Sequence, residues 1–411
     1  MTRRVLVRAT GSARPGQLGG LGQALAEAGA RLLDINQSVT FDMVAFETLV
    51  ALDEAGEEQR TRLEQSLEEA GDRHALVIQT VDVSEEDHER WSRGDGHTRL
   101  IVTLLAPKLP ATVLAELGRL TSAFGLTIEL IHRLSGREPL DGEAPERGVC
   151  IECWLRGESV DLDALRKGAL AIGADHGVDL AIQQDSIWRR HRRLICFDMD
   201  STLIQAEVID ELARRHGVYE EVAEVTERAM RGELDFQQSF RERMSKLAGL
   251  SESVLADIAE ELPLMPGVEH LLEQLRRLGY RTAILSGGFT WFAEYLQRRL
   301  GFDEVHANEL VIENGVVTGE VREPIVDADR KAQLLEEMAA RQGIRLEQTV
   351  AVGDGANDLK MLAVAGLGIA FRAKPTVREQ ARQSISTLGL DGVLYLLGYR
   401  DDDRDEVLGA R

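Results

Sequence analysis

The chain has 411 residues, 44% of them hydrophobic, and a formal net charge of −22. The length exceeds what one hydrophobic core usually supports, so we expect two or three domains, and the negative charge argues against nucleic acid or an anionic membrane as a partner, because their phosphates would repel it. Three cysteines form no disulfide framework, no apolar run approaches membrane-spanning length and the amino terminus lacks a signal-peptide core, so we expect a cytoplasmic protein.

The first 186 residues predict two copies of one β-α-β-β-α-β unit, the ferredoxin-like order. In the first copy the expected strands are residues 5–10, 31–41, 43–52 and 74–81, and the expected helices are residues 17–28 and 57–70. In the second copy the expected strands are residues 99–106, 127–134, 148–156 and 178–184, and the expected helices are residues 111–124 and 161–176. We place the two units at about residues 1–85 and 95–186, with the charged link 83–97 as their boundary.

This tandem resembles ACT domains, small modules that bind amino acids at domain interfaces and regulate metabolic enzymes. Such modules usually carry an Asp-x-Pro-Gly turn after the first strand, whereas the first copy has Ala13-Arg14-Pro15-Gly16 and the second has Pro107-Lys108-Leu109-Pro110. The resemblance implies a homodimer and an L-serine effector, and a purely structural or dimerising role remains the alternative. The glycines from Gly16 to Gly22 do not match G-x-G-x-x-G, which argues against a dinucleotide there.

Two short patterns precede the next domain. Cys150 and Cys153 form a C-x-x-C in a strand-like run, where their side chains should point to opposite faces. Without a second cysteine or histidine pair nearby, this argues against a zinc site. The basic run Trp188–Arg193 is interpreted as a solvated linker, and in an acidic chain it does not indicate nucleic acid.

The apolar run Leu194–Phe197 predicts a strand buried on both faces of a parallel sheet. It ends in Asp198, Met199, Asp200, Ser201 and Thr202. Two carboxylates so close need a cation or a shared proton, because like charges at short range repel. At the carboxyl end of a parallel strand they would face the crevice where open α/β sheets bind ligands. The alternative is that Asp198 and Asp200 are turn residues that cap the next helix, with Thr202 in its first turn.

Four expected helices follow, at residues 206–215, 219–231, 235–247 and 251–261. An all-helical insertion directly after a catalytic strand is typical of a lid that excludes water and recognises the substrate, so we place a cap at about residues 205–265. Glu207 lies about one helical turn past the aspartates, and Arg243 lies on a later helix. Charged residues on helices are usually solvated, so position alone gives these two no role.

Three later elements carry phosphate and metal chemistry. After a strand at residues 281–285, the Ser286 hydroxyl and the amides of Gly287 and Gly288 can approach a phosphate. Lys331, in the first turn of another helix, can supply a positive charge to the same phosphate. A buried-type strand from Thr349 ends in a glycine-bearing acidic turn, where Asp354 can complete an all-oxygen Mg²⁺ site.

The order Asp-x-Asp-x-Thr, Ser, Lys and Gly-Asp-Gly-x-Asn-Asp strongly resembles the haloacid dehalogenase superfamily of phosphotransferases over about residues 194–398. The sequence segments that resemble the phosphoserine phosphatase family are Phe197–Leu203, Glu207, Phe236–Arg243, Leu285–Phe289 and Val352–Asp358. The resemblance implies an α/β fold with a Rossmann-like parallel-sheet core at residues 190–398 and a helical cap, preceded by the two ferredoxin-like ACT domains. An acidic tail at residues 399–411 follows, of which we interpret residues 401–406 as disordered.

Carried over by position, the resemblance makes Asp198 the nucleophile and Asp200 the general acid and base. It implies that Asp198, the Asp200 backbone carbonyl and Asp354 hold Mg²⁺, that Glu207 takes the substrate amino group and that Arg243 takes its carboxylate. The residues implied to bind substrate are Glu207, Arg243, Ser286, Gly287, Lys331 and Asn357, with Thr202 and Asp358 in support.

The activity implied is Mg²⁺-dependent hydrolysis of O-phospho-L-serine to L-serine and phosphate through an aspartyl phosphate, the last step of serine biosynthesis. The alternative within the same fold is a phosphatase or phosphotransferase for another small phosphorylated metabolite. A non-catalytic amino-acid sensor is the rival of another class. It is disfavoured because such a domain needs none of Asp198, Asp200, Lys331 and Asp354.

Overall fold

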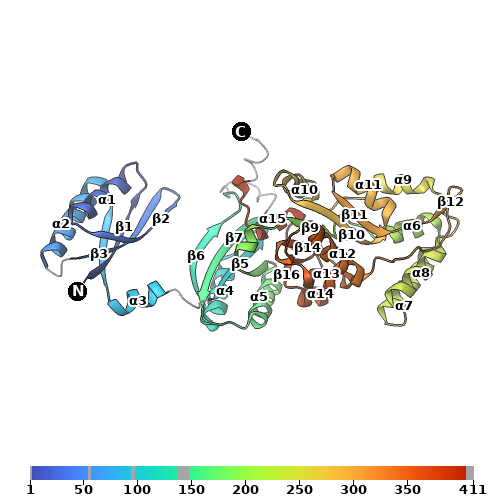
Figure 1. The fold of residues 1–411 in the computed structure, drawn as a ribbon, viewed down its shortest axis with the longest axis horizontal. Coiled ribbons are helices and arrows are strands. Elements are labelled where there is room, and N and C mark those ends of the chain that lie inside the picture. Colours follow the sequence, from blue (N-terminus) through green and yellow to red (C-terminus); the bar gives the residue numbers. More distant parts are fainter. Residues whose placement is uncertain (1, 54–56, 94–97, 138–147, 404–411) are drawn as a thin grey trace. The chain divides into compact units, whose positions relative to one another are not determined.

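The computed structural model describes residues 2–53, 57–93, 98–137 and 148–403 (Figure 1). Its contacts divide the chain into two compact units, Met1–Gly96 and His97–Arg411, and each is described by itself. No helix within the described ranges combines the length and the apolar character needed to cross a membrane.

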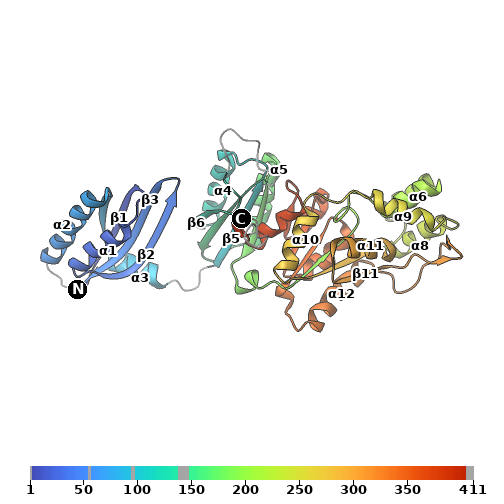
Figure 2. The same cartoon turned by 90° about the horizontal axis from the view of Figure 1, so that it is seen from above.

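The first unit is a four-stranded antiparallel sheet with the order β2-β3-β1-β4 and two helices packed on one face (Figure 2). Its elements are β1 (Arg3–Ser12), α1 (Gln17–Glu27), β2 (Arg31–Thr40), β3 (Met43–Leu52), α2 (Glu57–His74) and β4 (Val77–Val83). Alternate residues of β1 such as Val5 and Val7 meet Leu21 of α1 and Leu63 of α2 in the core, as period-two burial requires. The ferredoxin-like order expected for the first copy is confirmed.

The charged link after this sheet holds a helix that the sequence interpretation omitted. Helix α3 (Glu85–Arg93) begins after Ser84, whose hydroxyl oxygen accepts a hydrogen bond of 3.0 Å from the Asp87 amide. Ser84 therefore acts as an N-cap, and Glu85, Glu86 and Asp87 place negative charge in the first turn, where it stabilises a helix.

The second unit opens with the same fold repeated. The sheet order is β6-β7-β5-β8, again fully antiparallel. Its elements are β5 (Thr98–Ala106), α4 (Ala111–Ala123), β6 (Thr127–Arg133), β7 (Val149–Gly157), α5 (Leu162–His176) and β8 (Asp179–Gln184). Cys153 packs in the core of this copy, whereas Cys150 packs on the other side with Phe197 and the carboxyl-terminal helices, so the two thiols do point to opposite faces.

A six-stranded parallel sheet with the order β11-β10-β9-β14-β15-β16 forms the rest of the unit. Its strands are β9 (Leu194–Phe197), β10 (Arg281–Phe289), β11 (Glu304–Asn308), β14 (Thr349–Gly353), β15 (Leu367–Phe371) and β16 (Gln383–Ile385). In β9, Leu194 and Cys196 enter one core cluster, whereas Ile195 and Phe197 enter the other. Both faces are thus buried, and the expected Rossmann-like parallel sheet is confirmed.

Helices cover both faces of this sheet (Figures 1 and 2). They are α10 (Val268–Arg277), α11 (Thr290–Leu300), α12 (Ala328–Arg341), α13 (Leu359–Val364), α14 (Pro375–Gln380) and α15 (Val393–Leu396). Short 3-10 turns lie at Ile187–Arg190, Leu346–Gln348, Ala356–Asp358 and Leu390–Gly392. Because β9 and β14 are central neighbours, the acidic turns after Phe197 and Gly353 open at the same edge of the sheet.

The cap consists of α6 (Val208–His216), α7 (Tyr219–Met230), α8 (Phe236–Lys246) and α9 (Ser253–Glu261). It was expected to be all-helical, and that expectation is incomplete. A two-stranded hairpin, β12 (Ile312–Glu313) and β13 (Val316–Val317), packs on it from later in the chain. Val317 exchanges backbone hydrogen bonds of 2.8 Å with Gly249 and Leu250, because its amide donates to Leu250 and its carbonyl accepts from Gly249.

The basic run Trp188–Arg193 is not a solvated linker. Arg189 and Arg192 are both buried, and the Arg189 guanidinium forms an ion pair with the buried Glu152 of β7. The second ferredoxin-like fold also joins the parallel sheet through β16, where the Gln383 side chain accepts a 2.8 Å hydrogen bond from the Ile182 amide. The run therefore belongs to a packed junction between the two folds.

The acidic tail is ordered where it is described. The Asp401 carboxylate accepts hydrogen bonds from the Gly136 amide at 2.6 Å and from the Tyr395 hydroxyl at 2.9 Å. The expectation of disorder is therefore wrong for residues 401–403, whereas residues 404–411 lie outside the described part of the chain. Hydrogen bonds to Gly136, 265 residues away in the sequence, and to Tyr395 outweigh the charge pattern that is typical of disorder.

Candidate active site

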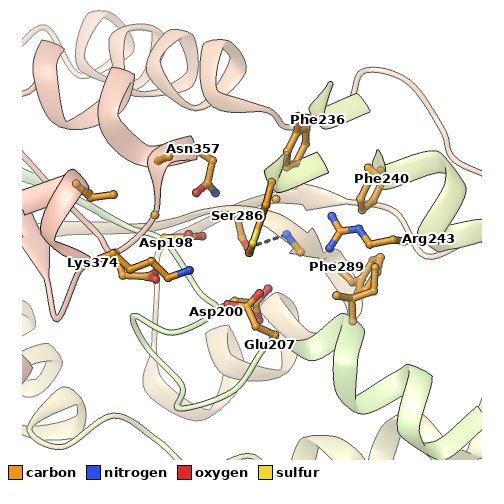
Figure 3. A pocket seen from close by; sticks show the side chains of 18 of the residues that line it. Asp198, Asp200, Glu207, Phe236, Phe240, Arg243, Ser286, Phe289, Asn357 and Lys374 are labelled. Carbon is orange, nitrogen blue, oxygen red and sulfur yellow. Dashed lines mark hydrogen bonds between the residues drawn. The ribbon is translucent and has the colours of Figure 1, made fainter. Parts of the chain in front are cut away.

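The expected site residues meet in one cavity of about 390 Å³ at the carboxyl edge of the parallel sheet, under the cap (Figure 3). Of the sequence candidates, those that line the cavity are Asp198, Asp200, Glu207, Arg243, Ser286, Gly287, Asp354 and Asn357. Thr202, Lys331 and Asp358 do not line it. They contact the carboxylates that do.

Asp198 sits directly after β9, where its backbone amide still donates to Val352 of β14 at 2.9 Å. Its Oδ1 accepts from the Met199 amide at 2.7 Å and lies 2.9 Å from Lys331 Nζ. Its Oδ2 has no hydrogen-bond partner within the described chain. One oxygen is therefore fixed and the other faces the cavity, the orientation that a nucleophilic carboxylate needs.

Lys331, fully buried in α12, bridges two carboxylates. Its ammonium lies 2.9 Å from Asp198 Oδ1 and 2.7 Å from Asp358 Oδ1. Burial alone would lower the pKa of Lys331, but the charges of Asp198 and Asp358 outweigh it and raise that pKa above its usual value. The side chain is thus a fixed positive charge behind Asp198.

Asp198, Asp354 and Asp358 form an acidic cluster whose ligand oxygens all lie within 4.8 Å of one another. Burial, followed by repulsion from Asp198, raises the pKa of Asp354 to about 8 and that of Asp358 to about 7. A single lysine leaves three neighbouring carboxylates with excess negative charge. An all-oxygen donor set with this charge fits a hard divalent cation such as Mg²⁺.

Hydrogen-bond donors around this cluster occupy some of its carboxylate oxygens and leave others available for a ligand. Asp358 Oδ1 accepts from Lys331, and Asp358 Oδ2 accepts from the Gly355 amide at 2.9 Å. Asp354 Oδ1 accepts from the Thr202 hydroxyl at 3.0 Å. Asp358 is therefore occupied on both oxygens, whereas Asp198 and Asp354 each keep an oxygen free for a ligand.

Asp200 caps a helix, and its surroundings also raise the pKa of its carboxyl group. Its Oδ1 accepts a 3.2 Å hydrogen bond from the amide of Val208, the first residue of α6. Burial and then the charges of Glu207 and Asp198 raise the pKa of Asp200 well above its usual value. The capping interpretation is thus half correct, because Asp200 does cap a helix, but the helix starts eight residues later and Asp198 caps none.

Ser286 and the two glycines after it form the wall of the reaction cavity at the end of β10. The Gly288 amide donates to the Ser286 hydroxyl at 2.9 Å at the end of β10. A Cβ at Gly288 would lie 2.8 Å from Asp200 Oδ2 and 2.7 Å from Met199 Cε, so only glycine fits. The buried Asn308 of β11 fixes this wall by donating to the Gly287 carbonyl at 2.8 Å and accepting from the Val326 amide at 2.7 Å.

The cap contributes one acidic and one basic side chain to the same cavity, as Figure 3 shows. Glu207 Oε1 accepts from the Ser201 hydroxyl at 2.9 Å, and desolvation raises the pKa of Glu207. The Arg243 Nε atom is buried without a hydrogen-bond partner in the described chain. An unfilled donor of this kind in a cavity is a ready site for a carboxylate.

The cavity also has members that the sequence interpretation missed. Phe236 stacks on Phe240 with ring centroids 6.2 Å apart, and Phe240 meets Phe289 at 6.0 Å, which makes an apolar wall beside Arg243. Lys374 directs its ammonium into the cavity from the turn after β15 (Figure 3). Its position after a parallel strand was the available signal, since all such turns open at this edge.

Comparisons with known proteins agree with this geometry. A family model described as haloacid dehalogenase-like hydrolase matches residues 192–366, and a model described as ACT domain matches residues 3–82. A phosphoserine phosphatase of Mycobacterium tuberculosis is 40% identical over 396 residues, which span 96% of this chain and 93% of that protein. A phosphoserine phosphatase of Streptomyces coelicolor is 40% identical over 411 residues, 99% of this chain and 94% of that protein.

Two solved structures share the fold. The unliganded form of a probable phosphoserine phosphatase from Vibrio cholerae aligns with a TM-score of 0.58 at 37% identity, over 78% of this chain and 90% of that one. A HAD-family hydrolase from Salmonella enterica aligns with a TM-score of 0.63 at 30% identity, over 73% of this chain and 98% of that one. Both alignments extend well beyond the length of one domain.

Proposed function

Because the chain belongs to the phosphoserine phosphatase family of haloacid dehalogenase-like hydrolases, we propose that it hydrolyses O-phospho-L-serine to L-serine and phosphate, the last step of serine biosynthesis. One observation carries the substrate: Glu207 and Arg243 line the same cavity as Asp198. A carboxylate and a guanidinium beside a phosphoryl-accepting group match the ammonium, carboxylate and phosphate of a phosphorylated amino acid.

Asp198 is the nucleophile in this proposal. Its Oδ2 attacks phosphorus while the bond from phosphorus to the serine oxygen breaks, so a carboxylate phosphate forms on the protein. Lys331, 2.9 Å from Asp198 Oδ1, supplies positive charge where the phosphoryl group arrives. The Ser286 hydroxyl and the Gly287 backbone hold the phosphoryl oxygens on the other side, and Asn357 supports them.

Asp200 moves the proton. Burial and the neighbouring carboxylates raise its pKa, so it can enter the reaction protonated. Its Oδ1 accepts from the Val208 amide, which leaves Oδ2 to deliver a proton to the departing serine oxygen. The same oxygen then takes a proton from the water that attacks the phosphorus and releases phosphate, and Asp198 is restored.

Mg²⁺ is the proposed cofactor. The residues that would hold it are Asp198, the Asp200 backbone carbonyl and Asp354, since Asp358 is held by Lys331 and Gly355. When bound, the ion neutralises charge on the transferring phosphoryl oxygens. Thr202 would orient Asp354 through its 3.0 Å hydrogen bond.

The test compares two substrates in cap variants. Glu207→Gln and Arg243→Ala should each lower kcat/KM for phosphoserine by about 10²-fold or more, whereas hydrolysis of a small aryl phosphate should change little, because the groups lost meet only the amino-acid part. The matched controls are Glu211→Gln, half-buried on α6 and paired with Arg214, and Arg241→Ala, exposed on α8 and paired with Glu323. Unchanged phosphoserine kinetics in both cap variants would instead favour another phosphorylated metabolite.

We also propose that L-serine binds the ACT domains as an effector. The match of residues 3–82 to an ACT model and the repeated topology support this. Calorimetry of the full chain with Asp198→Asn/Arg243→Ala, which blocks turnover and removes the proposed carboxylate contact in the reaction cavity, should register serine at millimolar concentration. Absence of heat there would leave the domains with an assembly role only.

A homodimer in the cytoplasm completes the proposal. Val77 and Val81 on the edge strand β4 are 67% and 49% exposed, an apolar strip suited to a second copy. Cys150, Cys153 and Cys196 are free thiols, in keeping with a reducing compartment. Val81→Lys should shift the mass in light scattering toward the monomer, and an unchanged dimer would place the interface elsewhere.

A further inference from the structure

A second, larger cavity lies in the second unit, away from the reaction cavity, where the second ferredoxin-like fold meets the parallel sheet. Its volume is about 1030 Å³, and a smaller cavity of about 280 Å³ adjoins it through shared residues, among them Arg166 and Arg382. Residues of helix α5 line one side, and residues of α14 and of the segment after it line the other. We call the two together the junction groove.

The junction groove is basic in an acidic protein. Its six cationic side chains are Arg166, Lys167, Arg192, Arg345, Arg378 and Arg382, against three carboxylates, whereas the whole chain carries −22. Lys167 and Arg382 form no ion pair within the described ranges. So dense a group of like charges in a hollow is stabilised by an anion from solution.

Buried donors in the groove lack partners. Arg192 is 6% exposed, and its Nη1 donates to the Thr349 carbonyl at 3.0 Å, but its Nε has no partner in the described chain. The Nε atoms of Arg166 and Arg378 are also buried without a hydrogen-bond partner in the described chain. Buried guanidinium N–H groups are costly to leave unpaired, and phosphate oxygens are strong acceptors for guanidinium donors.

We propose that the junction groove binds a small phosphorylated anion. The volume exceeds the need of a single orthophosphate and suits a molecule with two or more phosphates or a phosphorylated metabolite. Trp188 lines the groove, with the Arg345 guanidinium 5.1 Å above its ring, so a planar group also finds a stacking surface. Nothing in the proposed phosphatase chemistry uses these residues.

A short helix links this groove to the reaction cavity. Lys374, the N-cap residue of α14, lines the reaction cavity together with Thr376 and Val377, whereas Arg378 and Gln380 at the other end of the helix line the groove. The Lys374 carbonyl accepts from the Val377 and Arg378 amides at 2.9 and 3.0 Å. An anion that draws on Arg378 therefore acts on the backbone that aims the Lys374 ammonium, and this part of the inference rests on the proposed function.

Calorimetry on the full chain with pyrophosphate, ATP and orthophosphate, at constant ionic strength, tests the binding step. Wild type should bind at least one, with a change in Trp188 emission that Trp188→Phe abolishes. The double variant Lys167→Gln/Arg382→Gln should bind about tenfold more weakly or worse, with phosphoserine turnover in the absence of added anion unchanged. Lys360→Gln, an exposed lysine that pairs with Asp329, is the matched control.

The probes distinguish the source of the phosphate. Orthophosphate binding that depends on Lys167 and Arg382 indicates the free ion, whereas binding of ATP or pyrophosphate alone indicates a phosphorylated metabolite. The proposal is overturned if no probe binds at millimolar concentration, or if the double variant binds the probes as tightly as wild type does. It is also overturned if the double substitution changes only the molecular mass of the protein in solution, which would make the groove a contact between copies. Because binding is measured without turnover, a wrong substrate assignment leaves this result unaffected.

Discussion

At the scale of single residues, Asp198 carries the most weight. Asp198→Asn removes the carboxylate that we propose as the nucleophile and should lower kcat for phosphoserine on the order of 10³-fold or more. The fold should persist, because the amide keeps the Oδ1 acceptor for the Met199 amide and relieves repulsion on Asp354. Steady-state kinetics with a melting curve check both halves, and Asp329→Asn, an exposed pair partner of Lys360, is the control. Turnover near the wild-type rate would exclude Asp198 as nucleophile.

The acidic cluster predicts a pH effect in the metal-free protein. The pKa of Asp354 is about 8 when folded against an ordinary 3.8, so between these values the folded chain holds a proton that the unfolded chain has released. The free energy of unfolding must therefore fall as pH rises from about 4 to 8. Denaturant titrations with a chelator should give this slope, and Asp354→Asn should flatten it. Mg²⁺ should restore stability at pH 8, and an equal slope in the variant would contradict the argument.

Single residues were also where sequence reasoning reached its limit. The strand-end rule brought Asp198, Ser286 and Asp354 to one edge, since it depends only on strand order. It could not separate Lys331, buried behind Asp198, from Lys374, which faces the cavity, because both are lone lysines near helix starts. That difference depends on packing, which local sequence does not encode.

At the scale of elements, the sequence identified strands and helices by period, and it missed pieces that tertiary contact creates. The hairpin β12–β13 has only two residues in each strand, too few for an alternation pattern, and it is held by Gly249 and Leu250 of the cap. Helix α3 was missed because its charged composition is also typical of a linker. Hydrogen bonds to the cap domain hold the hairpin in place, and an N-cap residue stabilises the start of α3.

Asn308 of β11 provides a prediction at this scale, because one side chain fixes the end of β10. Asn308→Ala should lower the free energy of unfolding by about 1–3 kcal/mol, since the Gly287 carbonyl and the Val326 amide lose a buried partner. It should also raise KM, because Gly287 lines the reaction cavity. Asn308→Asp keeps the acceptor and should keep the hydrogen bond from Val326. A variant with native KM and stability would show that β10 holds its shape unaided.

At the scale of the whole molecule, the repeated ferredoxin-like order and the parallel sheet were both predictable, because each follows from element order. The attachment of the second copy to the parallel sheet was not. It depends on Arg189, which looked like a linker cation and is instead buried against Glu152. Charge in a linear sequence gives no sign of which partner it will meet.

This ion pair gives the prediction for the molecule. Glu152→Ala leaves the Arg189 charge buried and unpaired, so it should cost roughly 3–5 kcal/mol of stability. The double variant Glu152→Met/Arg189→Met should recover most of that loss, because no charge remains to desolvate. Denaturant unfolding of wild type, Glu152→Met, Arg189→Met and the double variant forms a double-mutant cycle. A single variant as stable as wild type would mean that water reaches the pair.

The contact between Gln383 and Ile182 has a consequence for how this protein avoids aggregation. The side-chain amide of Gln383 accepts from the Ile182 amide and donates to the Ile182 carbonyl, so it takes the place of a peptide unit on a neighbouring strand. Strands β8 and β16 both end their sheets, and an open sheet border can recruit another polypeptide into an intermolecular ribbon. Here each border closes the other. Trimming the enzyme to its catalytic half would reopen β16 and favour precipitation.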